Sequence, residues 1–595
     1  MNLRVKRAKE LCSYLAGEVK KDGVAITFKR GTAFLRRRMG KKRGRFLPAE
    51  SALRRQRAEQ HPEWPCISIC VPLYNTPKPF FTEMVQSVLA QTCANWQLCL
   101  ADASDSDVAG DWVKAIADAR IVYTKVENKG ISANTNAAAS LAKGAYLALL
   151  DHDDVLAPNA VYEMAKAAHE TQSDFLYSDE ALFANDITRA MVGHFKPDFA
   201  PDYLLCCNYI CHFAAFRREL FWRVGALNPD MDGSQDHDLF LRLSNVAAPV
   251  HIPKVLYYWR VHSQSTSGGT AAKPYVAAAA KAAINAHLAR IGAKGHAEDG
   301  LFPSTYRVVY DVPSEPLVSI LIPNKDHIAE LATALSSIRD KTRYQNYEIL
   351  IIENNSENPE TFAFYDKAVQ EDARRRVLRY EGGFNFSKIN NFAASEAKGE
   401  YLLLLNNDVE VINAEWLTEL VAEGMQPGVG IVGAKLLYPD GSLQHAGVIT
   451  GLGGFAGHSH KYARGDAGGY MFRIGTVQNF SAVTAACLLT PKAVYQEVNG
   501  LDEEFAVAFN DVDFCLRVLN QGYRVIYTPY ATLYHHESKS RGLDTSGAAK
   551  ARFDAERARL FARYGKSLVH DRFYSPNLTL DREDFSENDV LPRDL

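Results

Sequence analysis

Runs of apolar residues alternate with helix-like patterns along most of the chain. Strand-like runs end at Pro72, Leu100 and Leu150, and helical spacing covers residues 81–91 and 135–142. Strands that are apolar at every position and joined by helices are typical of a parallel sheet with both faces covered. Ligands of such sheets gather beyond the carboxyl ends of the strands. The pattern therefore predicts an α/β fold whose binding crevice lies where these runs end.

The same plan occurs twice. The segment from Asn136 to Leu147 aligns without gaps on the segment from Asn391 to Leu402, and most aligned positions are identical. The strands before it and the acidic segments after it match in the same order, so we expect two tandem α/β domains. The expected boundaries are a basic helical arm over residues 1–60, a first domain over 61–300, a linker over 301–316, a second domain over 317–572 and a tail over 573–595.

The composition is that of an ordinary globular protein of 595 residues, with 47% hydrophobic and 23% charged residues. Apolar runs stay below the roughly 20 residues that a membrane-spanning helix needs, and the first residues lack the apolar core of a secretory signal. We therefore expect a cytoplasmic protein. The ten cysteines are scattered, and free thiols are expected. The cluster from Cys206 to His212 fits no common structural zinc pattern.

The net charge of −3 conceals a strongly basic beginning. Residues 1–60 hold 18 lysine and arginine residues against 5 acidic ones, with Phe34, Leu35 and Phe46 among them. Such a segment suits an anionic membrane surface, where each cation contributes about 1 kcal/mol. We expect peripheral contact with the cytoplasmic face of an inner membrane. A solvated or nucleic-acid-binding tail is the alternative, and no nucleic-acid partner is expected.

Acidic residues follow the strand that ends at Leu150. Asp151, Asp153 and Asp154 are so close that their carboxylates repel one another unless a cation compensates. Mg²⁺ or Mn²⁺ typically takes one or two protein carboxylates and completes its shell with phosphate oxygens and water. The pattern thus predicts a divalent metal that holds a diphosphate, with a ligand-free acidic turn as the alternative. In the second repeat the corresponding residues are Asn406 and Asp408.

Two further acids and two histidines recur in register. Asp236 and Asp511 each precede an apolar helical segment, and each is either a helix cap or a general base that takes a proton from an attacking hydroxyl. Recurrence favours the base, because many residues cap helices equally well. His262 and His536 each follow a tyrosine-rich strand and are candidate metal ligands as neutral imidazoles. His535 competes with His536 for that position.

Taken in order, these motifs resemble the GT-A fold of family 2 glycosyltransferases. The order is P-x-Y-N, D-A-S, N-x-G-x-S, a hydrophobic strand into D-H-D-D, Q-D-x-D and a late histidine, and it covers residues 65–290 and again 317–545. The segments Gly383–Asn391 and Tyr177–Glu180 further resemble bacterial tandem-domain members that assemble O-antigen, capsule or other surface polysaccharide. Asn406 departs from the family pattern, and Thr135 and Asn390 stand where members often carry an arginine.

The resemblance implies a bifunctional, metal-dependent, inverting glycosyltransferase. It would transfer sugars from nucleoside-diphosphate sugars to a growing glycan or lipid-linked glycan. The implied catalytic bases are Asp236 and Asp511, and the implied metal is Mn²⁺ or Mg²⁺. The implied nucleotide contacts are Pro72, Tyr74, Asp102 and Asp151, then Pro323, Glu353, Asn354 and Asn406; the implied metal ligands are Asp151, Asp153 and His262, then Asp408 and His536.

Other functions remain open at this point. The second domain could be a non-catalytic glycan-binding or scaffold domain, since Asn406 replaces an acid. A sugar nucleotidyltransferase is disfavoured, because Pro72-Leu73-Tyr74-Asn75 stands where a glycine-rich phosphate loop is needed. A glycosidase would use paired carboxylates that flank the bond and would have no use for a metal–diphosphate site.

Overall fold

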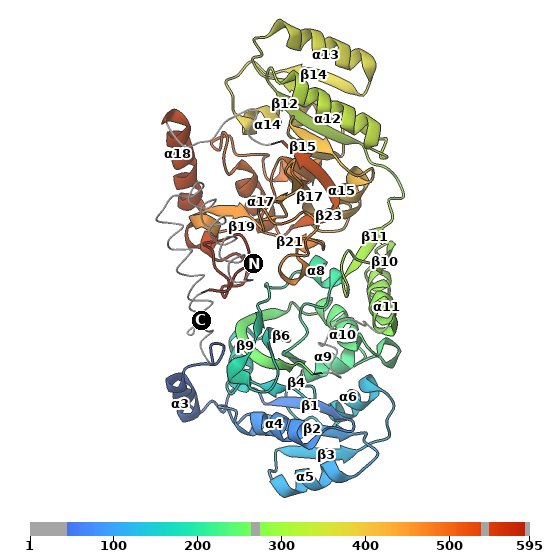
Figure 1. Ribbon diagram of the computed structural model, residues 1–595, viewed down its shortest axis with the longest axis vertical. Helices are drawn as coiled ribbons and strands as arrows, with labels where there is room; N and C mark the ends of the chain where they lie inside the picture. The colour runs from blue at the N-terminus through green and yellow to red at the C-terminus, as the bar shows by residue number, and fades with distance from the viewer. Residues whose placement is uncertain (1–43, 263–273, 537–546, 589–595) are drawn as a thin grey trace, which may run out of the picture.

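The computed structural model describes residues 44–262, 274–536 and 547–588, and it places two α/β halves one above the other (Figure 1). The first half, residues 61–300, runs from blue to green, and the second half, residues 317–572, from yellow to red. Of the basic arm expected over residues 1–60, residues 1–43 lie outside the described residues. The described remainder contains helix α3 (Glu50–Ala58). The predicted tandem α/β organisation is confirmed.

The first half is built on one mixed sheet with the strand order β3-β2-β1-β4-β8-β6-β9-β5. β1 runs parallel to β2 and β4, whereas β8 is antiparallel to β4 and β6. Strands β1 and β2 are buried almost throughout, as their continuous apolar runs predict. The strands are β1 (Ile67–Leu73), β2 (Trp96–Asp102), β3 (Ile121–Lys125), β4 (Tyr146–Leu149), β5 (Val155–Leu156), β6 (Phe175–Phe183), β7 (Val192–His194), β8 (Ala214–Arg217) and β9 (Val250–Arg260).

The second half repeats this sheet with the order β14-β13-β12-β15-β22-β17-β23-β16. The pairing of Leu403 with Leu489 matches that of Ala148 with Ala215, so equivalent positions can be read from the registers. The strands are β12 (Val318–Asn324), β13 (Tyr347–Glu353), β14 (Arg375–Arg379), β15 (Tyr401–Leu405), β16 (Val409–Val411), β17 (Val429–Leu437), β18 (Leu443–His445), β19 (Val448–Thr450), β20 (Ala456–His458), β21 (Gln478–Asn479), β22 (Cys487–Pro491) and β23 (Arg524–His535).

Helices join the parallel strands and cover the sheets. Helix α4 (Lys78–Leu89) contains Pro79 in its first turn, where a missing N–H leaves no bond unmade. Helix α6 (Ile131–Ser140) begins earlier than predicted, after Gly130, whose φ of 95° suits glycine. The other helices include α5 (Val108–Ile116), α7 (Ala160–Thr171), α8 (Pro201–Cys206), α9 (Arg218–Arg223), α10 (Gln235–Ser244), α11 (Pro274–Ile291), α12 (Ile328–Lys341), α13 (Pro359–Glu371), α14 (Phe386–Glu396), α15 (Trp416–Gly424), α16 (Lys492–Glu497), α17 (Asn510–Asn520) and α18 (Gly547–Tyr564).

Polar contacts and a hairpin lie between the halves. The Asp202 N–H donates to Asn479 Oδ1 at 3.0 Å, and the Asn479 amide donates to the Asp202 carboxylate at 2.6 Å. Arg524 lies 2.8 Å from the same carboxylate. Strand β10 (Gly295–Asp299) pairs with β11 (Tyr306–Tyr310), so the range expected as a linker contains an ordered strand.

The segment from Asp571 to Asn588, here called the C-terminal strap, contacts both halves. The Asn577 amide donates to Asp179 Oδ2 at 2.9 Å in the first half. The Gly453 N–H donates to the Leu580 carbonyl at 2.8 Å in the second half. The part of the expected tail that the structure describes therefore packs at the junction.

Candidate active sites

One of the acids after β4 has a structural role. Asp154 is buried, and its carboxylate accepts hydrogen bonds from the Tyr257 hydroxyl at 2.6 Å and from the Arg260 N–H at 2.7 Å. Burial raises the pKa of Asp154 well above its usual value, and the charges of Asp151 and Asp153 raise it further. Asp154 therefore anchors the turn to β9 and is not free to contact a ligand.

The other two acids of this turn each lie beside a histidine. Asp153 Oδ2 lies 2.8 Å from the Nε2 of His262, so the predicted acid and histidine are side by side. The Asp151 side chain is 47% exposed, and its carboxylate lies 3.7 Å from the Nε2 of His212. Loss of water raises the pKa of Asp151, with Asp153 and Asp236 adding repulsion while His212 opposes it. This crowding of negative charge suits a divalent cation.

Asp236 lies in the first turn of α10 and has two protein partners. Its Oδ1 accepts a hydrogen bond from the His237 N–H at 2.9 Å, and its Oδ2 accepts one from the Asn208 amide at 2.7 Å. Its negative charge is also one of the causes that raise the pKa of Asp151. Asp238, in contrast, is buried and bound by Arg242 at 2.6 Å. Asp236 is thus the acid of this helix that a substrate could reach.

The predicted nucleotide contacts of the first half lie at the ends of β1 and β2. Pro72 is paired with Ala101 in the sheet, and Tyr74, just after β1, is 47% exposed. Asp102 is buried, and hydrogen bonds from Ser104, Tyr123 and Lys125 lower its pKa although burial opposes the charge. The Lys125 ammonium lies 3.1 Å from the carboxylate. Asp102 is therefore ionised and held in place at the crevice edge.

In the second half, Asp408 lies beside His535. The Asp408 Oδ1 is 3.1 Å from the His535 Nε2, and the Asn406 amide donates to the same nitrogen at 3.1 Å. His536 points elsewhere, with its Nε2 3.5 Å from Glu410, and only its backbone N–H contacts Asp408. Of the two candidate histidines, the structure therefore brings His535, rather than the favoured His536, to Asp408.

The protonation pattern at Asp408 suits a cation. The His535 Nδ1 donates to Gln444 Oε1 at 2.6 Å, which leaves a lone pair on Nε2. Asp408 Oδ1 is buried and has no hydrogen-bond partner. The Asp408 oxygen and the His535 ring nitrogen would form a donor set for Mn²⁺ or Mg²⁺ once the Asn406 amide, which donates to that nitrogen in this structure, gives way. Among the described residues, no group of three or more histidine, cysteine or acidic side chains could hold a metal ion, so substrate and water would have to complete the shell.

Asp511 occupies the position of Asp236, in the first turn of α17. Its Oδ2 accepts a hydrogen bond from the Ala485 N–H at 3.2 Å and its Oδ1 accepts one from the Val512 N–H at 2.9 Å. Burial raises the pKa of Asp511 although these hydrogen bonds oppose the shift. A carboxylate with a raised pKa accepts a proton more readily near neutral pH.

Glu353 is the last residue of β13 and Asn354 follows it, while Pro323 of β12 pairs with the preceding residue Ile352. The Glu353 carboxylate accepts hydrogen bonds from Ser356 at 2.6 Å and from the Tyr365 hydroxyl at 2.7 Å. The Asn354 amide donates to the Gly382 carbonyl at 2.8 Å. These predicted nucleotide contacts therefore lie together at the edge of the second crevice, as their counterparts do in the first.

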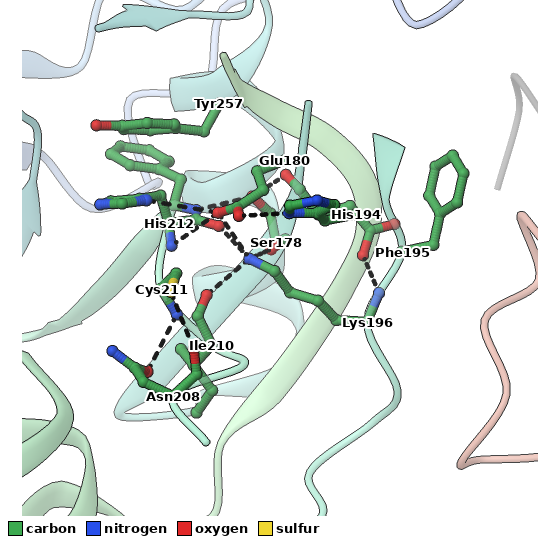
Figure 2. Close-up of polar contacts among 12 residues, drawn as sticks. Ser178, Glu180, His194, Phe195, Lys196, Asn208, Ile210, Cys211, His212 and Tyr257 are labelled. Atoms are coloured by element: carbon green, nitrogen blue, oxygen red, sulfur yellow. Dashed lines mark hydrogen bonds and ion pairs between the residues drawn. The ribbon is translucent and has the colours of Figure 1, made fainter. Parts of the chain in front are cut away.

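A buried ionic cluster behind Asp151 was not among the predicted site residues. Glu180 on β6 pairs with Lys196 at 3.3 Å, and both are buried (Figure 2). His194 and His212 lie 3.1 and 3.5 Å from the Glu180 carboxylate. Burial opposes a positive charge on His212, but the nearby Glu180 and Asp151 carboxylates outweigh it and raise the pKa of His212 to about 9. The first crevice therefore has a charged wall near neutral pH.

Two sequence signals pointed towards this cluster without giving its chemistry. Glu180 ends a segment that resembles family members, and His212 ends the cluster considered as a zinc site. Cys206, Cys207 and Cys211 form no disulfide. The Cys211 thiol donates to the Asn208 carbonyl at 2.9 Å, and the His212 ring is the group of that cluster that reaches Glu180. In the parts of the chain that the structure covers, no helix is both long and apolar enough to cross a membrane.

The chain is similar in sequence to known proteins along most of its length. A family model described as "Glycosyl transferase family 2" matches residues 68–225 and 319–470. The uncharacterized protein y4gI of Sinorhizobium fredii is 42% identical over 88% of this chain and 58% of its own length. The O-antigen biosynthesis protein RfbC of Myxococcus xanthus is 37% identical over 87% of this chain and 41% of its own length. The chain thus spans about half the length of these relatives.

Solved structures show more distant likeness. S. aureus TarS in complex with UDP has 17% identity and a TM-score of 0.30 over 38% of this chain and 65% of that one. The mannosyltransferase PcManGT from Pyrobaculum calidifontis, in complex with GDP-Man and Mn²⁺, has 15% identity and a TM-score of 0.32. The match covers 43% of this chain and 69% of that one. These likenesses are too distant to assign a ligand to this chain.

Proposed function

Because the chain belongs to glycosyl transferase family 2, we propose that it is a bifunctional inverting glycosyltransferase. It would transfer sugars from nucleoside-diphosphate sugars to a growing glycan of a bacterial surface polysaccharide. The family model matches one segment in each half, which supports two centres. RfbC, at 37% identity, is described as an O-antigen biosynthesis protein, which supports the product class.

The acid–imidazole pair in each crevice carries the proposal. In the first half, a carboxylate oxygen of Asp153 lies 2.8 Å from a ring nitrogen of His262. In the second half, a carboxylate oxygen of Asp408 lies 3.1 Å from a ring nitrogen of His535. These pairs would hold Mn²⁺ or Mg²⁺, and in the first half the Asp151 carboxylate, which lies 3.7 Å from His212 in this structure, would add negative charge beside the ion. When bound, such an ion neutralises charge on the leaving diphosphate.

Asp236 and Asp511 would be the catalytic bases. The acceptor hydroxyl oxygen forms a bond to the anomeric carbon while the bond from that carbon to the diphosphate oxygen breaks. The hydroxyl proton passes to the carboxylate. A single in-line displacement of this kind inverts the anomeric configuration. The raised pKa of Asp511 and the fixed position of Asp236 beside Asn208 support this role.

The nucleotide would lie across the ends of the first two strands of each sheet. Tyr74 offers an exposed aromatic face and Asp102 an ionised carboxylate. Asp151 and Asn406 would reach the ribose or the diphosphate. The full set of proposed nucleotide contacts is Pro72, Tyr74, Asp102 and Asp151 in the first half, and Pro323, Glu353, Asn354 and Asn406 in the second.

The acceptor would be a growing glycan or a lipid-linked glycan at the cytoplasmic face of the inner membrane. The cationic composition of residues 1–60 supports a peripheral contact with that surface. No nucleic-acid partner is part of the proposal.

A donor screen tests the proposal. Full-length protein is incubated with a panel of nucleotide sugars and Mn²⁺ or Mg²⁺, with one half inactivated at a time by Asp153→Ala or Asp408→Ala. Each variant is expected to lose one transfer step and keep the other. The proposal would be contradicted if the wild-type protein neither hydrolysed any donor of the panel nor transferred a sugar from it.

A second candidate is that the second half binds glycan without catalysing transfer. Asn406 favours it, because this amide replaces an acid and donates to the imidazole that would otherwise serve a cation. Under this alternative, Asp511→Asn leaves every transfer step at full rate while glycan binding persists. Loss of one step in Asp511→Asn would exclude it.

A further inference from the structure

The loop between α8 and β8 links the two functional acids of the first half. At one end, the Asn208 amide donates to Asp236 Oδ2 at 2.7 Å. At the other end, the His212 ring lies 3.7 Å from the Asp151 carboxylate and stacks on Tyr257, with the ring centroids 4.5 Å apart. A shift of this loop would therefore move the surroundings of both acids together.

Buried charges fix this loop in position. The Lys196 ammonium donates to the carbonyls of Ser178 at 2.8 Å and Ile210 at 2.6 Å, and also to that of His212. The Glu180 carboxylate accepts from the His212 N–H at 3.1 Å and lies 3.5 Å from its ring nitrogen (Figure 2). The backbone and the ring of His212 are thus both held by the Glu180–Lys196 pair.

The second half has this sheet without this cluster. The strand registers place Leu436 where Glu180 lies, Gly447 where Lys196 lies and Ala486 where His212 lies. The same half has Asn406 where the first has Asp151. Burying an ion pair costs desolvation energy, and a fold that forms without the pair does not require it. The acid at the position of Asp151 and the cluster behind it are therefore present together in the first half and absent together in the second.

We propose that His212 is a positioning residue for Asp151, fixed by Glu180 and Lys196, and that it holds this carboxylate towards the bound cation. The inference rests on the proposed function, in which Asp151 contributes to a divalent-metal site. It adds a reason for the difference between the halves: an acid at the first position of this turn, as Asp151 is, needs a rigid partner, whereas the amide of Asn406 at that position does not. Groups behind a metal ligand typically change metal affinity by about 10–100-fold when removed.

A double-mutant cycle in full-length protein tests the inference. All variants carry Asp408→Ala, so that Mn²⁺ binding, followed by electron paramagnetic resonance without substrate, reports on the first half. His212→Ala and Asp151→Asn are each expected to weaken Mn²⁺ binding about tenfold. In the Asp151→Asn background, His212→Ala is expected to add almost nothing, because coupled residues are not additive.

Two further variants separate positioning from general damage. His212→Gln keeps a side-chain donor and is expected to lose less affinity than His212→Ala. His169→Ala, at an exposed position on α7, is the matched control and should bind Mn²⁺ as the parent does. Full additivity of His212→Ala with Asp151→Asn, or unchanged affinity in His212→Ala, would overturn the inference. If the parent binds no Mn²⁺ at all, the proposed function fails for the first half, and the inference fails with it.

Discussion

The two halves place different chemistry at the same positions of the same sheet. Pairing of β6 with β7 sets Glu180 opposite His194, whereas pairing of β17 with β18 sets Leu436 opposite His445. In the first half the imidazole of His194 lies 3.1 Å from the carboxylate of Glu180. In the second it contacts another imidazole, because the Nδ1 atoms of His445 and His458 are 2.8 Å apart.

The consequence is that the histidines at these equivalent places differ in charge, being protonated in the first half and neutral in the second. Glu180 raises the pKa of His212 to about 9, against burial, whereas burial lowers the pKa of His458 to about 3. Burial also lowers the pKa of His445 well below its usual value. Near pH 7 the first wall carries an imidazolium and the second carries neutral rings. Apolar strands preserved the register in both copies, while the residues behind the crevice were free to change.

The largest expected effect comes from removing the proposed bases. Asp236→Asn and Asp511→Asn keep a hydrogen-bonding side chain but cannot take a proton, so each should slow one transfer step by about 10²–10⁴-fold. Chromatography of acceptor products from the full-length protein measures each step. Asp366→Asn, at an exposed position on α13, is the control and should leave both rates unchanged. If only Asp236→Asn has an effect, the difference between the halves extends to catalysis itself.

The opposite charge states predict opposite pH dependence of stability in metal-free protein. The folded pKa of His212 is above the unfolded value of about 6.5, so its contribution is present below pH 6.5 and is lost as pH rises through 9. This loss is no more than about 3 kcal/mol. The folded pKa of His458 is below 6.5, so stability is lost as pH falls below 6.5, by about 2 kcal/mol at pH 5.

Chemical unfolding followed from pH 5 to pH 9 measures this dependence. His212→Gln should flatten the alkaline side of the profile, and His458→Gln should flatten the acid side. A profile in which both variants change the same side would contradict the difference in wall charge.

The smallest expected effect is a gain of function. Asn406→Asp restores an acid in the second crevice, and a further carboxylate should raise its Mn²⁺ affinity about tenfold. The measurement uses paramagnetic resonance in a background with Asp153→Ala, which silences the first half. Weaker binding in Asn406→Asp would mean that repulsion with Asp408 dominates where no counterpart of His212 is present.

Much of the fold could be predicted because the repeat and the apolar runs are local signals. The segment from Asn136 to Leu147 and its copy fix the order of helices and strands, and strand ends bring Asp153 and His262 to one edge. The start of α6 was missed, because Gly130 allows the helix to begin before the apolar positions that predicted it.

Other parts of the site depend on register across the sheet, which the sequence does not display. The turn at Asn406–Asp408 is one residue shorter than the turn at Asp151–Asp154. Val409 then pairs with His535, which brings that ring, rather than the ring of His536, to Asp408. The Glu180–Lys196 pair likewise forms only because β7 folds back on β6.

The C-terminal strap has a consequence for the order of synthesis. Residues 571–588 leave the ribosome after both halves, and at about 5–20 residues per second the first half waits roughly 15–50 s for them. Two of the apolar clusters contain buried residues from both halves, so they are complete only after the second half has been made. Apolar residues of the first half such as Phe195 wait for these partners, and the chain is most exposed to aggregation in this interval.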